Sequence, residues 1–248
     1  MSLLRDKENG CEWDKEQTFQ SIAPFTIEEA YEVADAIDRS NHDDLKEELG
    51  DLLLQVVFLS QIASEDQLFN FDDVAKIITQ KLVRRHPYVF SEKRDHSSGE
   101  QLDQWENIKQ KERSKKNQNG TLDGISINLP ALKRSQKIQK RAAKVGFDWP
   151  DTKGVFKKIK EETLELEDAI NSENKESIKE EIGDLLMIVT NLAQKLDIDS
   201  EEALRDSNKK FIKRFSFIEK KLTESKKNIQ DTDLSILDEL WNESKKLG

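Results

Sequence analysis

The chain has 248 residues and a formal net charge of −10, with 36% charged and 35% hydrophobic residues. This length suits one large domain or two domains of roughly 100–150 residues. The negative charge argues against a protein that binds nucleic acid polymers, because phosphate backbones are bound mainly through a surplus of Lys and Arg. A polyanionic substrate would therefore need a cation.

Neither export nor a membrane span is indicated. Cys11 is the single cysteine and can form no disulfide within the chain, and no basic segment followed by an apolar run opens the sequence. The longest strongly apolar stretch, residues 52–59, is far shorter than the ~20 residues that a membrane-spanning helix needs. We therefore expect a cytoplasmic protein.

The first predicted helices form a pair. Apolar residues at spacings of three and four span residues 27–37, with Pro24 and Thr26 as start signals, and then residues 45–59. Asn41 marks the turn between them, so we expect an antiparallel helical hairpin.

Two more helices and a linker come next. We expect helices at about residues 72–85, with Asp72 as N-cap, and at residues 103–115. Residues 114–130 are rich in Asn, Gly and Ser and end with Pro130, which blocks helix continuation. The expected organisation is a first domain at 1–113, a linker at 114–130 and a second domain at 131–248.

The second half repeats the helical pattern. Asn171 and Ser172 mark the turn of a second hairpin, and Ser200 is the expected N-cap of the helix that follows it. The predicted helices of this half are at about residues 132–144, 159–170, 178–189, 200–221 and 234–246. No segment alternates long enough to require a sheet, so the expected fold class is all-α.

Two copies of one helical module account for this pattern. Residues 27–37 resemble residues 160–170, and residues 46–53 resemble residues 179–186, each pair being 133 positions apart. A repeat of this kind indicates that one supersecondary unit occurs twice along the chain.

Acidic residues recur at the same offset. Residues three and four apart share a helix face, so several carboxylates would converge if the two helices of a hairpin face each other. Such convergence is unfavourable without a counter-ion, and oxygen ligands favour Mg²⁺, Mn²⁺ or Ca²⁺. The alternative is a solvated acidic face. The recurring acids are Glu28, Glu29, Glu32, Glu47, Glu48 and Asp51, and Glu161, Glu162, Glu165, Glu180, Glu181 and Asp184.

Other metal sites fit the sequence less well. A di-iron site of this kind would need Glu-x-x-His motifs, which the chain lacks, and zinc would need more Cys or paired His ligands. Gly50 and Gly183 lie within the acidic helices, where each costs about 1 kcal/mol relative to Ala. Close helix packing beside the site would offset that cost, and a harmless glycine is the alternative.

A basic pair follows each hairpin. Lys81 and Arg85 are four residues apart, as are Lys210 and Arg214, so each pair shares a helix face. Arg and Lys beside a metal site suit a triphosphate, because both bind phosphate oxygens. Surface charge on an amphipathic helix is the alternative interpretation for each residue.

The sequence resembles the MazG nucleoside triphosphate pyrophosphohydrolases in their tandem two-domain form. The motif is E-E-x-x-E followed by E-x-x-D, and both halves keep it intact. The similarity extends to the segments at residues 5–19, 84–90, 129–149 and 208–215.

The resemblance implies a helical-bundle fold, a requirement for Mg²⁺ with Mn²⁺ as a substitute, and hydrolysis of NTPs and dNTPs between the α- and β-phosphates. It also implies a homodimer in which helices of two subunits complete each bundle. By motif match, Glu161 and Glu162 are the catalytic candidates, Asn208, Lys210, Arg214 and Trp241 bind substrate, and the metal ligands are Glu162, Glu165, Glu181 and Asp184, with Glu29, Glu32, Glu48 and Asp51 in the first module.

The two modules are not equal in this comparison. Residues 81–85 resemble residues 210–214 at an offset of 129 positions, and at that offset Thr79 stands where the second module has Asn208. The second module is therefore the expected catalyst. Two other functions stay open. One is a non-catalytic adaptor whose acidic faces bind a basic partner, and the other is a helical pyrophosphatase for a single substrate, such as dUTP or a nucleotide of histidine biosynthesis.

Overall fold

The structure is a computed structural model that describes residues 1–90, 108, 112 and 120–247. Every regular element in these ranges is a helix, which confirms the predicted all-α class. The chain divides into two compact units, Met1–Lys111 (unit one) and Glu112–Gly248 (unit two). Apart from residues 108 and 112, the helix expected at residues 103–115 lies outside the described part of the chain.

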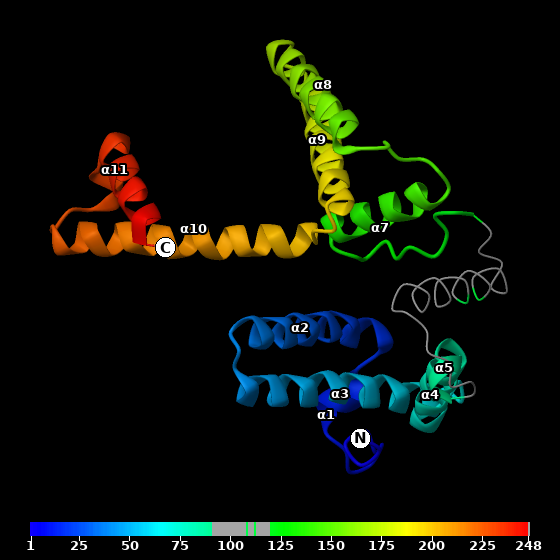
Figure 1. Cartoon of the computed structure of the whole chain (residues 1–248). Coiled ribbons are helices and arrows are strands. Elements are labelled where there is room, and N and C mark those ends of the chain that lie inside the picture. Colours follow the sequence, from blue (N-terminus) through cyan, green and yellow to red (C-terminus); the bar gives the residue numbers. More distant parts are fainter. Residues whose placement is uncertain (91–107, 109–111, 113–119, 248) are drawn as a thin grey trace. The chain divides into compact units, whose positions relative to one another are not determined.

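Unit one is built on a helical hairpin. Figure 1 shows α2 and α3 side by side and antiparallel, with α1 near α3 and the N-terminus. Ser40 turns the chain between α2 and α3 with a φ of 53°. Its helices are α1 (Glu12–Glu16), α2 (Phe19–Asp38), α3 (His42–Glu65), α4 (Phe71–Arg85) and α5 (Pro87–Phe90).

Capping residues begin α2 earlier than the sequence suggested. The Thr18 hydroxyl accepts a hydrogen bond from the Ser21 N–H, and the Ser21 hydroxyl accepts one from the Thr18 N–H. This capping box satisfies two backbone donors, so the helix starts at Phe19. Pro24 and Thr26 therefore lie inside α2, and their expected role as start signals is wrong.

Two other N-caps also differ by a residue or two from the expected positions. Asn70, not Asp72, caps α4, because the Asn70 side chain accepts a hydrogen bond from the Asp73 N–H. Asp199, not Ser200, caps α10 in the same way through the N–H groups of Glu201 and Glu202.

Unit two contains the second hairpin and a long diverging helix. Figure 1 shows α8 and α9 side by side, α7 near one end of α9, and α10 running away from that end with α11 folded back over it. The elements are α7 (Ala131–Lys144), α8 (Thr152–Asn171), α9 (Lys175–Lys195), α10 (Ser200–Glu224), η1 (Ile229–Asp231), α11 (Leu234–Ser244) and η2 (Lys245–Leu247).

Apolar contacts hold the first hairpin and polar contacts hold α7 in the second unit. Ile22, Phe58 and Ile62 are buried together between α2 and α3. In unit two, the hydroxyls of Ser135 on α7 and Thr190 on α9 are hydrogen-bonded at 2.7 Å, and Thr190 is only 2% exposed. A buried hydroxyl group costs free energy unless it is hydrogen-bonded, so this contact holds α7 against α9.

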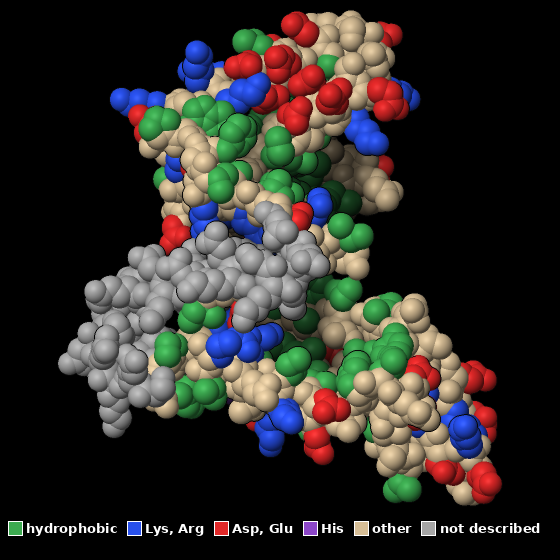
Figure 2. All heavy atoms as spheres, turned by 90° about the vertical axis from the view of Figure 1, so that its right-hand side faces the viewer, with side chains coloured by type: hydrophobic (Ala, Val, Ile, Leu, Met, Phe, Trp, Pro, Cys, Tyr) green, Lys and Arg blue, Asp and Glu red, His purple; other side chains and the backbone are tan. Residues whose placement is uncertain are grey.

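Much of the predicted apolar stripe stays exposed, because a hairpin covers each of its helices on one side only. Figure 2 shows green apolar side chains across the visible face, and red acidic side chains gathered toward the end of the α8–α9 hairpin at the top of the view. None of the described helices has the length and apolar character needed to cross a membrane. The apolar residues of the two hairpins that are at least half exposed are Ile27, Ile37, Leu49, Leu53, Phe156, Leu164, Ile170, Leu186 and Met187.

Candidate active site

The first carboxylate cluster joins α2 and α3. Glu29, Glu48 and Asp51 each place one carboxylate oxygen within 4.8 Å of the others. Burial, followed by the charges of Asp51 and Glu32, raises the pKa of Glu29. Burial, followed by the charge of Glu32, raises the pKa of Glu48 as well. The four residues predicted as metal ligands in unit one therefore interact electrostatically with one another; they are Glu29, Glu32, Glu48 and Asp51.

The second cluster joins α8 and α9 at the equivalent positions. Glu162, Glu165 and Glu181 lie within the same 4.8 Å limit, and Glu162 is 5% exposed. Burial, followed by the charges of Glu165, Glu162 and Asp184, raises the pKa of Glu181. Asp184 is thus near the cluster although it lies outside the tightest group.

Both clusters fit a hard divalent cation. Each offers several carboxylate oxygens, which are the ligands that Mg²⁺, Mn²⁺ and Ca²⁺ prefer, and neither includes a histidine or cysteine. Burial first, and then the neighbouring carboxylates, raise the pKa values of Glu29 and Glu181, and a bound cation would offset both effects.

Sequence reasoning missed Lys158, one helical turn before the acids of α8. Its Nζ lies 2.7 Å from Glu161 Oε1 and 2.6 Å from Glu162 Oε1. These hydrogen bonds raise the pKa of Lys158 and lower the pKa of Glu161. In this arrangement Glu161 is a weaker base than an isolated glutamate. The spacings of three and four residues are the signal that would have found this contact.

The four residues predicted to bind substrate lie on two helices, Asn208, Lys210 and Arg214 on α10 and Trp241 on α11. The Arg214 guanidinium lies 5.6 Å from the centre of the Trp241 ring, so these two come together as a cation–π pair. Phe211, which the sequence analysis did not single out, lies 5.1 Å from the same ring. Asn208 and Lys210 are exposed on α10.

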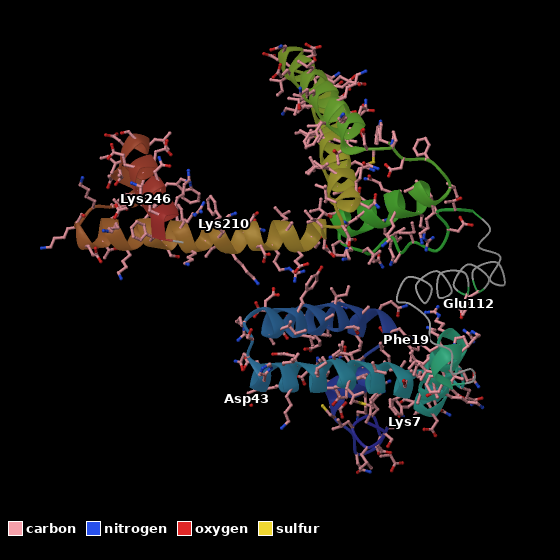
Figure 3. The ribbon with its side chains drawn as sticks, viewed as in Figure 1. Lys7, Phe19, Asp43, Glu112, Lys210 and Lys246 are labelled. Atoms are coloured by element: carbon pink, nitrogen blue, oxygen red, sulfur yellow. The ribbon has the colours of Figure 1, made fainter. Side chains whose placement is uncertain are left out.

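This basic and aromatic group does not meet the carboxylates of its own unit. Figure 3 shows Lys210 on the part of α10 that has left the α8–α9 hairpin. Among the described residues, no ion pair joins Lys210 or Arg214 to the second cluster. Unit two by itself thus presents the two halves of the predicted site separately.

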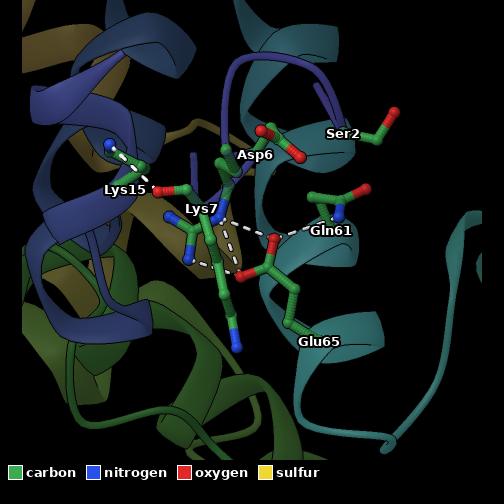
Figure 4. A pocket seen from close by; sticks show the side chains of 7 residues that line it. Ser2, Asp6, Lys7, Lys15, Gln61 and Glu65 are labelled. Carbon is green, nitrogen blue, oxygen red and sulfur yellow. Dashed lines mark hydrogen bonds and ion pairs between the residues drawn. The ribbon is translucent and has the colours of Figure 1, made fainter. Parts of the chain in front are cut away.

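A pocket of about 350 Å³ lies elsewhere in unit one. Figure 4 shows Glu65 and Gln61 on its wall, with dashed lines joining Glu65 to neighbouring side chains. The Arg5 guanidinium donates hydrogen bonds of 2.7 to 3.1 Å to both oxygens of Glu65, so the negative charge of Glu65 is already neutralised. No acid of the first cluster lines this pocket. We therefore assign the chemistry to the carboxylate clusters.

The two glycines beside the acids do not serve close helix packing within the chain. A Cβ atom added at Gly50 or at Gly183 would meet no atom within 4 Å. The expectation of a tight helix contact at these positions is wrong within each unit, because among the described residues the helix face that holds each glycine is open.

Comparison with known proteins identifies the family. The MazG nucleotide pyrophosphohydrolase domain matches residues 17–90 and again residues 152–216. The nucleoside triphosphate pyrophosphohydrolase of Escherichia coli K12 is 47% identical over 250 residues, which covers 99% of this chain and 94% of that protein.

Two further relatives agree with this match. The nucleoside triphosphate pyrophosphohydrolase/pyrophosphatase MazG of Thermotoga maritima is 43% identical over 99% of this chain and 92% of its own length. The uncharacterized protein YabN of Bacillus subtilis is 42% identical over 98% of this chain, which covers 50% of its own length. The chain therefore belongs to the MazG nucleotide pyrophosphohydrolase domain family, and it contains that domain twice in tandem.

Proposed function

We propose that the protein hydrolyses nucleoside triphosphates between the α- and β-phosphates and releases a nucleoside monophosphate and pyrophosphate. The observation that supports this most is the repeated convergence of carboxylates from two helices, in a chain of this family. Acids gathered in this way favour a divalent cation, and a cation is what a negatively charged protein needs to bind a triphosphate.

The second cluster is the proposed catalytic centre. Glu162, Glu165, Glu181 and Asp184 would hold Mg²⁺, with Mn²⁺ as a substitute, because they supply only oxygen ligands on two helices fixed by one turn. The bound ion would supply positive charge at the phosphate oxygens. Glu161, on the same helix, is the candidate for orienting or deprotonating the attacking water.

Lys210 and Arg214, four residues apart on one face of α10, would bind phosphate oxygens, and Asn208 would assist them from the same helix. Trp241, held beside Arg214, would present its ring to the nucleotide base. These roles require α10 and α11 to approach a carboxylate cluster, which they do not do within their own unit.

A homodimer would complete the site. Large apolar side chains of both hairpins are about half exposed, as for Ile27 at 51%, Leu53 at 55% and Leu164 at 61%. Gly50 and Gly183 face open space where a second subunit would fit closely. Burial of such faces is the main driving force for subunit association, so a second copy could both cover them and bring α10 to the acids.

The first cluster would bind a metal ion through Glu29, Glu32, Glu48 and Asp51. Unit one has no described counterpart of the α10–α11 aromatic group, and Thr79 replaces Asn208. We assign unit one to metal and nucleotide binding or to dimer contacts, and turnover to unit two.

Pyrophosphate release tests the proposal. The purified chain is incubated with Mg²⁺ and each of the eight common triphosphates, and pyrophosphate, phosphate and monophosphate are measured separately. We expect pyrophosphate with monophosphate, and a loss of about a hundredfold or more in the Glu181→Gln, Asp184→Asn double variant. The matched double variant of unit one, Glu48→Gln with Asp51→Asn, is expected to keep most of the activity.

The other functions predict different products. An acidic adaptor would release no pyrophosphate from any triphosphate. An enzyme for one substrate, such as dUTP, would act on that nucleotide alone, so dUTP is tested beside the eight common triphosphates. Full activity in the unit-two double variant would reject the assigned site.

A further inference from the structure

Equivalent carboxylates in the two units have different partners. Glu162 is almost fully buried and lies 2.6 Å from the Lys158 ammonium. Its counterpart in unit one is Glu29, and the residue at the position of Lys158 is Phe25. The Phe25 ring packs edge-on against Trp13, with 6.1 Å between ring centres, so it offers no charge to the first cluster.

Unit one instead satisfies its carboxylate with a neutral group. Gln55 is 7% exposed, and its Nε2 donates a hydrogen bond of 3.3 Å to Glu29 Oε1. The residue at the same position in unit two is Ile188, which is buried and has no polar side-chain atom. The two units therefore differ at both positions. A neutral amide, from Gln55, hydrogen-bonds the first cluster, and a charged ammonium group, from Lys158, pairs with the second.

This difference changes what a divalent cation meets. A cation that binds Glu162 must displace the Lys158 ammonium or remain within a few ångströms of it. Among the described residues no ammonium or guanidinium group pairs with Glu29, which has the Gln55 amide and the neighbouring Glu32 carboxyl as its hydrogen-bond partners. At the dielectric constant of water, with salt screening, a single and a double positive charge about 5 Å apart repel enough to weaken binding roughly fivefold to tenfold.

We infer that Lys158 is a built-in counter-ion that makes the second cluster bind divalent cations more weakly than the first when no nucleotide is present. The inference rests on the proposed function in one respect, namely that both clusters bind such ions. Unit one is then occupied at low concentrations of free metal, and unit two fills only at higher ones. The chain thus has two metal sites of different affinity in two copies of one fold.

Mn²⁺ binding to the full-length chain tests this inference without any assay of activity. Free Mn²⁺ is followed by electron paramagnetic resonance during a titration in the absence of nucleotide. Each cluster is studied with the other silenced, by Glu181→Gln with Asp184→Asn for the second cluster and by Glu48→Gln with Asp51→Asn for the first. We expect the first cluster to bind Mn²⁺ about five to ten times more tightly than the second.

Substitution of Lys158 then assigns the difference to this residue. With the first cluster silenced, Lys158→Met and Lys158→Gln should each raise the Mn²⁺ affinity of the second cluster by the same factor. Lys160→Met removes an equal charge from an exposed position of the same helix and should change the affinity less than twofold. Circular dichroism confirms that each variant keeps its helix content.

The outcomes separate this inference from the proposed function. Equal affinities of the two clusters, or an unchanged affinity in both Lys158 variants, would overturn the role of Lys158 and leave metal-dependent hydrolysis standing. Absence of Mn²⁺ binding at both clusters would overturn the role of Lys158 and the proposed metal sites together.

Discussion

The contact of Trp241 with α10 yields a prediction that can be worked out from the structure. Trp241 lies against Arg214 at 5.6 Å and against Phe211 at 5.1 Å. A cation–π contact at an exposed site contributes about 0.5–1 kcal/mol. An aromatic pair contributes about 0.5–1.5 kcal/mol. Replacement of Trp241 by Ala should therefore loosen α11 from α10 by about 1–2.5 kcal/mol.

Hydrogen exchange measured by mass spectrometry detects this loosening. Because each 1.4 kcal/mol corresponds to about tenfold, amides of residues 234–244 should exchange roughly five to seventy times faster in Trp241→Ala. Amides of the α8–α9 hairpin serve as the internal control and should not change, since this hairpin does not contact Trp241. Trp241→Phe keeps an aromatic ring and should show a smaller increase.

Unchanged exchange across α11 in Trp241→Ala would refute this account of how α11 is held. A uniform increase over the whole of unit two would contradict it too, because the contact would then support the entire unit. Trp241→Phe also separates two roles of the residue. If the ring covers the nucleotide, this variant should raise the KM for triphosphates while α11 stays in place.

Three further predictions concern stability. Burial and neighbouring charges raise the pKa of Glu181, so its ionisation in the folded protein lowers stability as pH rises above the ordinary glutamate range. Glu181→Gln should remove this loss of stability, and saturating Mg²⁺ should remove it in the unaltered protein. Tm measured against pH, with EDTA or with Mg²⁺, tests both expectations. Arg5 is 7% exposed in its side chain and pairs with the one-third exposed Glu65, so Arg5→Met should cost about 1–3 kcal/mol in urea unfolding of unit one, and a cost below 0.5 would contradict this. A Cβ on Gly154 would collide with the Trp149 ring, so Gly154→Ala should cost about 1–3 kcal/mol and shift tryptophan fluorescence; an unchanged spectrum would show that the ring packs elsewhere.

The helices and their pairing could be predicted because local physics determines them. The apolar spacing from residue 27 to residue 59 requires helices, and a short connection at Asn41 makes them antiparallel neighbours. The same spacing places Glu29 near Glu32 and Glu48 near Asp51. Convergence of these acids from two helices then followed from the hairpin alone.

Features that depend on competing local contacts were harder to predict. Pro24 is a common start signal, but the paired hydrogen bonds of Thr18 and Ser21 begin α2 before it. Lys158 lies among several lysines on α8, and its spacing of four residues from Glu162 shows only that a contact is possible; that Glu162 is buried against the ammonium group is known only from the structure.

Features that a second chain would supply, in the proposed homodimer, could not be derived from one sequence at all. The apolar stripes suggested a core, yet residues such as Leu164 and Ile170 remain exposed because a hairpin supplies only one covering helix. In the proposed homodimer, the separation of Arg214 from the carboxylates of its own unit has the same origin. Periodicity indicates which face of a helix is apolar, and it does not indicate which molecule covers that face.

The most direct test is diffraction from crystals of the protein grown with Mn²⁺ and a non-hydrolysable nucleoside triphosphate. An anomalous Mn²⁺ peak within bonding distance of Glu162, Glu165 and Glu181, with phosphate oxygens completing its coordination, is the predicted result. Mn²⁺ bound elsewhere, with these side chains directed into solvent and the nucleotide away from them, would contradict the proposed site.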